Sequence, residues 1–249
     1  MRNCDPDLEQ IYSPVDACRI TATLNRLARH DLSRLALPGG IAIELQLVRL
    51  GAEPGRRGAH DIDFIAQVFA DIPSTLATSL LVRHVHPHDP PSRNILQAVD
   101  AVTAMRVDIF RAYGDEWSRT LPVELAGVPL RLVAFEDLVA RHARLCWDLV
   151  EGKPVAPKFA RDLERMVQAL SPAGLEGVAM IWQEHRKPHM PPSFEFVLER
   201  LRTAIRRRPK LLVDPVYSTD VHALCGRCHA VAAFPLADAG EVKSILGYC

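Results

Sequence analysis

The sequence has no apolar run that approaches the roughly 20 residues a helix needs to cross a bilayer. It also has no excess charge of either sign, because 30 basic residues balance 30 acidic ones. The first absence argues against a membrane-spanning protein. The second removes any global attraction to nucleic acid, so contact with RNA would need a local basic patch. With nearly half of its 249 residues apolar, the chain has the composition of a globular protein with a substantial core.

No apolar region follows the first residues, Met1-Arg2-Asn3-Cys4-Asp5, so we expect no secretory leader. Six cysteines in a chain without such a leader indicate a reducing compartment. We therefore expect a cytoplasmic protein with no membrane partner.

Two short motifs stand out among what is present. Gly39 and Gly40 close a short apolar run, and acidic and apolar residues alternate over 61–64 from Asp61 through Asp63. Side chains two apart on a strand point to one face, so these carboxylates would stand side by side. Such a pair repels itself unless a hard ion such as Mg²⁺ binds it. The glycines would let a phosphate approach the main chain at the start of the next helix.

A third acid belongs to the same pattern. The segment 105–110 reads as a second strand, with apolar residues at Met105, Val107 and Ile109 and with Asp108 on the polar face. A carboxylate on a neighbouring strand would complete a two-metal site. The sequence therefore predicts that Asp61, Asp63 and Asp108 form one site for phosphate and divalent metal.

This order of motifs, Gly-Gly, helix, Asp-x-Asp and a later strand Asp, resembles the nucleotidyltransferase superfamily, which has the polymerase-beta-like fold. In particular it resembles small bacterial members related to abortive-infection toxin nucleotidyltransferases, over roughly Leu35 to Leu170. The resemblance implies an enzyme that moves a nucleoside monophosphate from a nucleoside triphosphate to an acceptor hydroxyl on RNA, such as transfer RNA, on protein or on a small molecule. The toxin relatives also imply a cognate antitoxin as a partner.

The resemblance assigns roles to the three acids. Asp61 and Asp63 would bind two Mg²⁺ ions, and Asp108 would share the second ion and help to activate the acceptor hydroxyl. The glycine turn, Gly39 and Gly40, would contact the nucleoside triphosphate.

A nucleotide-binding pair on a downstream helix is implied in the same way. Lys158 and Asp162 lie one turn apart, as in such relatives. Lys158 would pair with a phosphate, and Asp162 would orient it.

Two departures from the family pattern leave a second function open. Ile41 follows the glycine pair where Ser or Thr is common, and Ala59 stands where a hydroxyl residue often precedes the acids. The alternative is a nucleotidyltransferase-like protein without catalytic activity that binds or regulates a partner, such as a component of a toxin–antitoxin pair.

The tail offers a third alternative, a zinc-stabilised RNA-binding module. Cys225 and Cys228 have the spacing of a zinc knuckle, in which two thiolates hold a structural Zn²⁺. The remaining ligands would come from His222, His229 or Cys249. A basic run over 206–210 would hold RNA phosphates, although cations also suit the C-terminus of a helix.

The patterns together predict an α/β or α+β fold: a small mixed sheet of the nucleotidyltransferase type with flanking helices, a helical C-terminal region and a short cysteine-containing tail. We expect a catalytic domain over 1–150, a helical region over 151–212 and the tail over 213–249.

Three segments have the periodicity of amphipathic helices. Apolar residues recur at three- and four-residue spacing over 18–32, 135–149 and 159–170. We expect the first of these helices to cover the sheet.

Overall fold

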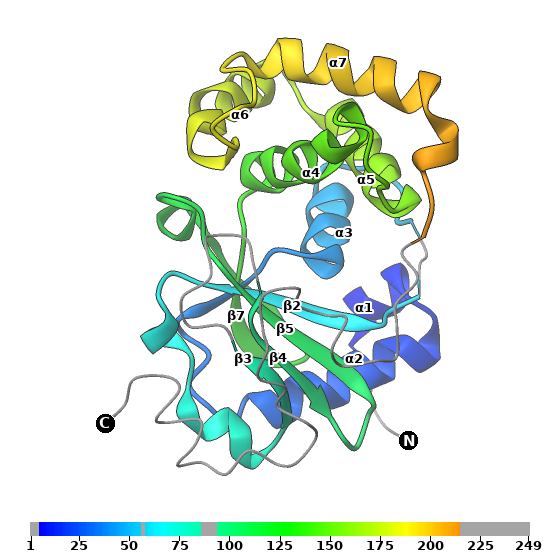
Figure 1. Cartoon of the computed structure of the whole chain (residues 1–249). Coiled ribbons are helices and arrows are strands. Elements are labelled where there is room, and N and C mark those ends of the chain that lie inside the picture. The colour runs from blue at the N-terminus through cyan, green and yellow to red at the C-terminus, as the bar shows by residue number, and fades with distance from the viewer. Residues whose placement is uncertain (1–4, 56–57, 86–93, 215–249) are drawn as a thin grey trace. The chain divides into compact units, whose positions relative to one another are not determined.

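The computed structural model describes residues 5–55, 58–85 and 94–214. The described residues form two compact units. The first, which we call the sheet unit, contains those within 5–49 and 53–133. The second, which we call the helical unit, contains residues 50–52 and 134–214. Figure 1 shows the elements of each unit.

The sheet unit is built on seven strands in the order β3-β4-β5-β2-β1-β7-β6. The strands are β1 (Leu35–Leu37), β2 (Asp61–Ala66), β3 (Leu81–Val85), β4 (Asn94–Asp100), β5 (Met105–Arg111), β6 (Leu121–Leu125) and β7 (Val128–Leu132). The pairs β2–β5 and β1–β7 are parallel, and the other neighbours are antiparallel. The predicted mixed sheet and the mixed α/β fold class are confirmed.

The β6–β7 hairpin turns at Ala126 and Gly127, which both have positive φ. Two consecutive positive φ angles match the right-handed twist of the flanking strands, and glycine adopts one of them without strain. The Asp5 side chain accepts a hydrogen bond from the Ala126 amide at 2.6 Å. Asp5 also caps the helix that follows it, so the hairpin tip is tied to the first helix of the chain.

Three helices accompany the sheet: α1 (Pro6–Ile11), α2 (Pro14–Leu27) and α3 (Gly40–Arg49). Helix α1 packs on α2 and α3, while α2 contacts β5 and α3 contacts β2. Ser13 caps α2, and proline occupies the first turn of both α1 and α2, where its missing N–H costs nothing. Short 3₁₀ helices lie at Phe69–Asp71, Ser74–Thr78 and Glu116–Arg119.

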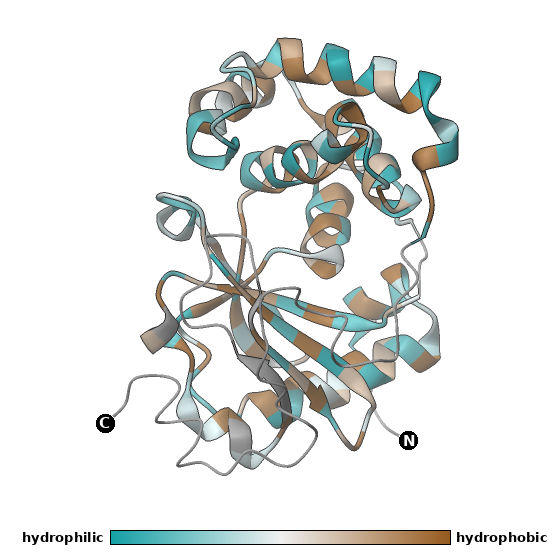
Figure 2. Ribbon diagram, in the orientation of Figure 1, coloured by the Kyte–Doolittle hydropathy of each residue, from teal (hydrophilic) through white to brown (hydrophobic). Residues whose placement is uncertain are grey.

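The helical unit consists of α4 (Phe135–Val150), α5 (Pro157–Ala169), α6 (Pro172–His185) and α7 (Phe194–Arg207), followed by a 3₁₀ turn at Pro209–Leu211. Helix α4 packs against the other three. Hydrophobic and hydrophilic residues alternate along α7 in Figure 2, as an amphipathic helix requires. Its buried Phe194 packs on the buried Trp182 of α6, with ring centroids 5.3 Å apart.

Within the described residues the sheet unit ends at Val133, and the predicted catalytic domain over 1–150, helical region over 151–212 and tail over 213–249 stay predictions. The unit ends there because α4 packs with α5, α6 and α7. The predicted zinc ligands Cys225, Cys228, His222, His229 and Cys249 lie outside the described residues. Among the helices that the structure describes, none has the length and hydropathy to span a bilayer.

Candidate functional site

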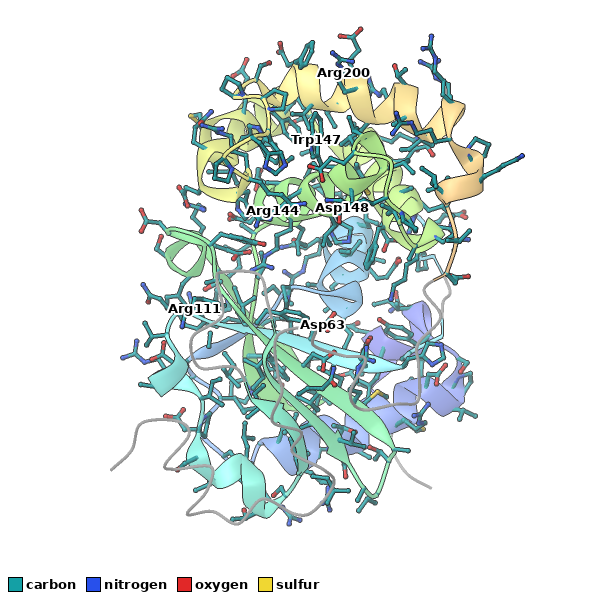
Figure 3. The ribbon with its side chains drawn as sticks, in the orientation of Figure 1. Asp63, Arg111, Arg144, Trp147, Asp148 and Arg200 are labelled. Atoms are coloured by element: carbon teal, nitrogen blue, oxygen red, sulfur yellow. The ribbon has the colours of Figure 1, made fainter. Side chains whose placement is uncertain are left out.

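Strand β2 carries the paired acids as its alternation predicts. Ile62 and Phe64 are buried in the core of the sheet unit, while Asp61 and Asp63 face the other side and are only partly buried. Period-two alternation thus directs both carboxylates to one surface of the sheet. Figure 3 labels Asp63 on this strand.

The third acid joins them from the neighbouring strand. In the parallel β2–β5 pair, Asp63 lies directly opposite Asp108, and Asp61 lies opposite Arg106. One carboxylate oxygen from each of Asp61, Asp63 and Asp108 lies within 4.8 Å of the others. The structure therefore brings together the three acids that the sequence singled out, in a group whose oxygen atoms suit a hard divalent cation.

Gly39 is pressed against the same carboxylates. Strand β1 runs antiparallel to β2, and Gly39 follows β1 and Pro38. Gly39 therefore lies close to Asp63 of β2. A Cβ atom built on Gly39 would lie 2.1 Å from Asp63 Oδ2, closer than any real contact. No side chain fits here while Asp63 keeps its position. Gly40 is the first residue of α3, so the glycine pair joins the site to a helix N-terminus.

Replacing Gly39 with alanine is expected to lower the free energy of unfolding by about 2 kcal/mol, because the new methyl group overpacks the Asp63 carboxylate. Urea unfolding would measure the change. The double variant Gly39→Ala/Asp63→Ala removes the carboxylate that clashes, so it should recover about half of the loss or more. Additive effects of the two substitutions would contradict the contact.

Asp108 is the most buried of the three acids. Burial raises the pKa of its carboxyl from 3.8 to about 6, although the nearby Arg106 charge lowers it in part. Asp108 Oδ1 makes no hydrogen bond of ordinary geometry with the described residues, although the Gln97 side chain lies close enough to the carboxyl to lower its pKa in part. A buried carboxylate oxygen without a donor is costly, and a metal ion is one group that satisfies it.

Arg106 supplies the positive charge within this group. Its guanidinium is hydrogen-bonded to Asp61 Oδ2, and its Nε lies 2.9 Å from Asp108 Oδ2. Burial opposes the charge of Arg106, but the carboxylates of Asp108 and Asp61 outweigh it and raise the guanidinium pKa above its usual range. Sequence reasoning missed this residue. Arg106 lies two positions before Asp108, so strand alternation alone would have put it on the acidic face.

Arg19 of α2 fixes the surroundings of the site, and sequence reasoning missed it too. Its guanidinium donates to the carbonyls of Thr103 and Ala104 in the β4–β5 turn, at 3.1 and 3.4 Å. It also donates to the carbonyl of Ala59, just before β2, at 3.5 Å. One side chain therefore ties the start of the Asp61 strand to the start of the Asp108 strand.

Lys158 and Asp162, the predicted nucleotide-binding pair, both lie on α5 in the helical unit, whereas the three acids and the glycines belong to the sheet unit. Asp162 is buried there. Burial, followed by the charge of Asp162, raises the pKa of the Cys146 thiol to about 12. The Lys158 ammonium lies 5.2 Å from the centre of the Phe159 ring. Their roles toward a nucleotide stay predictions.

The basic run at the end of α7 has a structural part. Arg208 donates from one guanidinium nitrogen to the carbonyls of Leu149 and Val150, at 2.8 and 2.9 Å. It thereby adds a side-chain donor to carbonyl groups at the C-terminus of α4, one of which, that of Leu149, also accepts from the Gly152 amide. Arg206 and Arg207 are exposed.

No protein-family model and no curated protein matches this sequence. A search of solved structures finds the crystal structure of an antigenic nucleotidyltransferase-like protein from Paracoccidioides brasiliensis. This chain is similar to it at 15% sequence identity and a TM-score of 0.40, over 81% of this chain and 92% of the other. The function proposed for this chain therefore rests on its own residues.

Proposed function

We propose that the sheet unit carries out metal-dependent nucleotidyl transfer. The observation that supports this most is the meeting of Asp61, Asp63 and Asp108 from two adjacent parallel strands, with one oxygen of each within 4.8 Å of the others. Three carboxylates converging on one partly exposed point are unfavourable by themselves and become favourable around a divalent cation.

Asp61, Asp63 and Asp108 would hold Mg²⁺, one or two ions in all. When bound, Mg²⁺ neutralises the triphosphate and lowers the pKa of the attacking hydroxyl. The fit of these residues to such an ion is supported by their oxygen chemistry and by the Asp108 Oδ1 atom, which makes no hydrogen bond of ordinary geometry with the described residues.

In the reaction, the acceptor hydroxyl oxygen bonds to the α-phosphorus of the triphosphate. The bond from that phosphorus to the oxygen bridging toward the β-phosphate breaks, pyrophosphate leaves with the electron pair, and the hydroxyl proton is released. The backbone at Gly39 has no side chain to keep a phosphate away, and Gly40 begins a ten-residue helix, whose first-turn amides have no partner within the helix itself. Positioning and charge neutralisation carry most of such a reaction.

We propose only that the acceptor carries a hydroxyl group. It would be RNA such as a transfer RNA, a protein side chain or a small molecule. A toxin–antitoxin context and a bacterial source stay predictions from the resemblance.

One observation favours the alternative of a non-catalytic, nucleotidyltransferase-like binding protein. Arg106 already compensates Asp61 and Asp108 within the protein, so the acids are satisfied in part without any metal. A site whose countercharge is a side chain could persist for structural reasons alone.

Calorimetric titration of the four nucleoside triphosphates, with and without Mg²⁺, tests the proposal without knowledge of the acceptor. We expect at least one triphosphate to bind only with Mg²⁺ and the Asp61→Asn/Asp63→Asn variant to lose at least about 1.4 kcal/mol, or tenfold, in affinity. The Asp7→Asn/Asp31→Asn variant, which removes two exposed acids of the same unit, should bind like the wild type. Absence of binding to the wild type would favour the non-catalytic alternative.

A further inference from the structure

Arg106 occupies the place in the acidic group where a cation is expected. It lies on β5, directly across from Asp61 and two residues before Asp108, so alternation puts its side chain on the same face as the carboxylates. Its guanidinium bridges the two strands by contacting Asp61 Oδ2 on one and Asp108 Oδ2 on the other.

Arg106 contacts two of the three carboxylates that would hold a metal, those of Asp61 and Asp108. Mg²⁺ binds carboxylate oxygens at about 2.0–2.1 Å, so an ion held by these three acids would lie close to the Arg106 guanidinium. Two cations held on the same carboxylates also repel each other strongly where water is partly excluded. The two occupants are therefore competitors.

The Arg106 side chain is also accessible to solvent. It is 25% exposed, while the side chain of Asp108 is only 5% exposed, so the guanidinium can move toward solvent while the acid stays in place. An arginine leaving this place keeps its charge, and its planar set of N–H donors suits the oxygens of a phosphate.

We infer that Arg106 is a built-in counter-cation: it holds the acids together in the metal-free protein, yields Asp61 and Asp108 to the divalent ion, and then binds a phosphate of the incoming triphosphate. The inference rests on the proposed function. It makes metal and nucleotide binding mutually supportive, because each favours the outward position of the same side chain.

The test compares two affinities in the Arg106→Gln variant by calorimetry. Binding of Mn²⁺ alone should become about tenfold tighter, because the competitor is gone. Binding of the triphosphate at saturating Mg²⁺ should become about tenfold weaker, because a phosphate partner is gone. A purely structural arginine would weaken both. The Arg34→Gln variant removes the same charge from an exposed site of the same unit and should change neither affinity by more than about twofold.

Arg106→Lys retains the charge without the planar donor set, and it serves if the glutamine variant fails to fold. Lysine loses the fork that contacts Asp61 and Asp108 together, so this variant should bind Mn²⁺ alone more tightly than the wild type, though less tightly than the glutamine variant does, and it should bind the triphosphate more weakly. If the wild type binds Mn²⁺ but neither variant binds it more tightly, the inference is overturned and the proposed function stands. If neither the wild type nor the variants bind Mn²⁺, both are overturned.

Discussion

Asp108→Asn is expected to make the metal-free protein more stable at pH 7, by about 3 kcal/mol. The carboxyl has a pKa of about 6 in the folded chain against 3.8 when unfolded, so folding favours its protonated form. Its contribution to stability is fully present below pH 3.8 and is lost as the pH rises through 6. Asparagine resembles the protonated form and removes this loss. Urea unfolding of both proteins between about pH 4 and 8 would measure the difference.

Two controls accompany this prediction. Asp7→Asn changes an exposed acid on α1 and should leave the free energy of unfolding at each pH within about 0.5 kcal/mol of the wild type. Added Mg²⁺ should stabilise the wild type at pH 7 by mass action and the Asp108→Asn variant much less. A wild-type stability that rises with pH across this range relative to the variant would contradict the burial of an ionised Asp108.

Asp137→Ala is expected to destabilise the helical unit by about 3 kcal/mol or more. Asp137 Oδ1 on α4 lies 2.7 Å from His185 Nε2 on α6, and both side chains are fully buried. Removing the carboxylate takes a buried hydrogen-bond partner from the His185 ring, which costs far more than losing an exposed pair. Trp147 and Trp182 both lie in this unit, so tryptophan fluorescence during urea unfolding would report the change.

The same helix provides the matched comparison. Asp148 pairs with Lys187 at 2.6 Å, but its side chain is 37% exposed, so Asp148→Ala should cost no more than about 1 kcal/mol. Equal losses for Asp137→Ala and Asp148→Ala would show that burial of the first pair does not determine its contribution.

The elements with strong periodicity were predictable from the sequence. The stripe over 135–149 became α4, and the alternation through Asp61 and Asp63 became β2. The stripe that starts at residue 18 belongs to α2, but this helix begins earlier, at Pro14, and ends earlier, at Leu27.

Two elements were missed. Helix α1 has only six residues, too few for a periodic stripe, although an Asp-Pro pair at 5 and 6 is an ordinary signal of a helix start. Strand β4 was missed because its turn to β5 contains neither glycine nor proline. Ala104 in this turn has a positive φ of 55°, which an alanine in the sequence does not predict.

The candidate site was predictable only as far as one strand at a time. The two-residue repeat of a strand predicted that Asp61 and Asp63 lie on one face. The register that sets Asp63 opposite Asp108, however, depends on packing across the sheet. The same register makes Arg106 the partner of Asp61, which no local pattern in either segment specifies. Gly39 was singled out as a turn for phosphate, whereas its closest contact is with Asp63 itself.

Strand β2 lies between β5 and β1, and its residues pair with positions 45 away along the chain, as Asp61 does with Arg106. The β4–β5 and β6–β7 hairpins and the helices need only local contacts, so they form early, while closing the long loop to β2 is slow. The carboxylates of Asp61 and Asp63 therefore reach Asp108 only when β2 pairs with β5. Binding of a divalent ion during refolding would therefore mark the pairing of β2 with β5, so a metal-sensitive signal would measure that step directly.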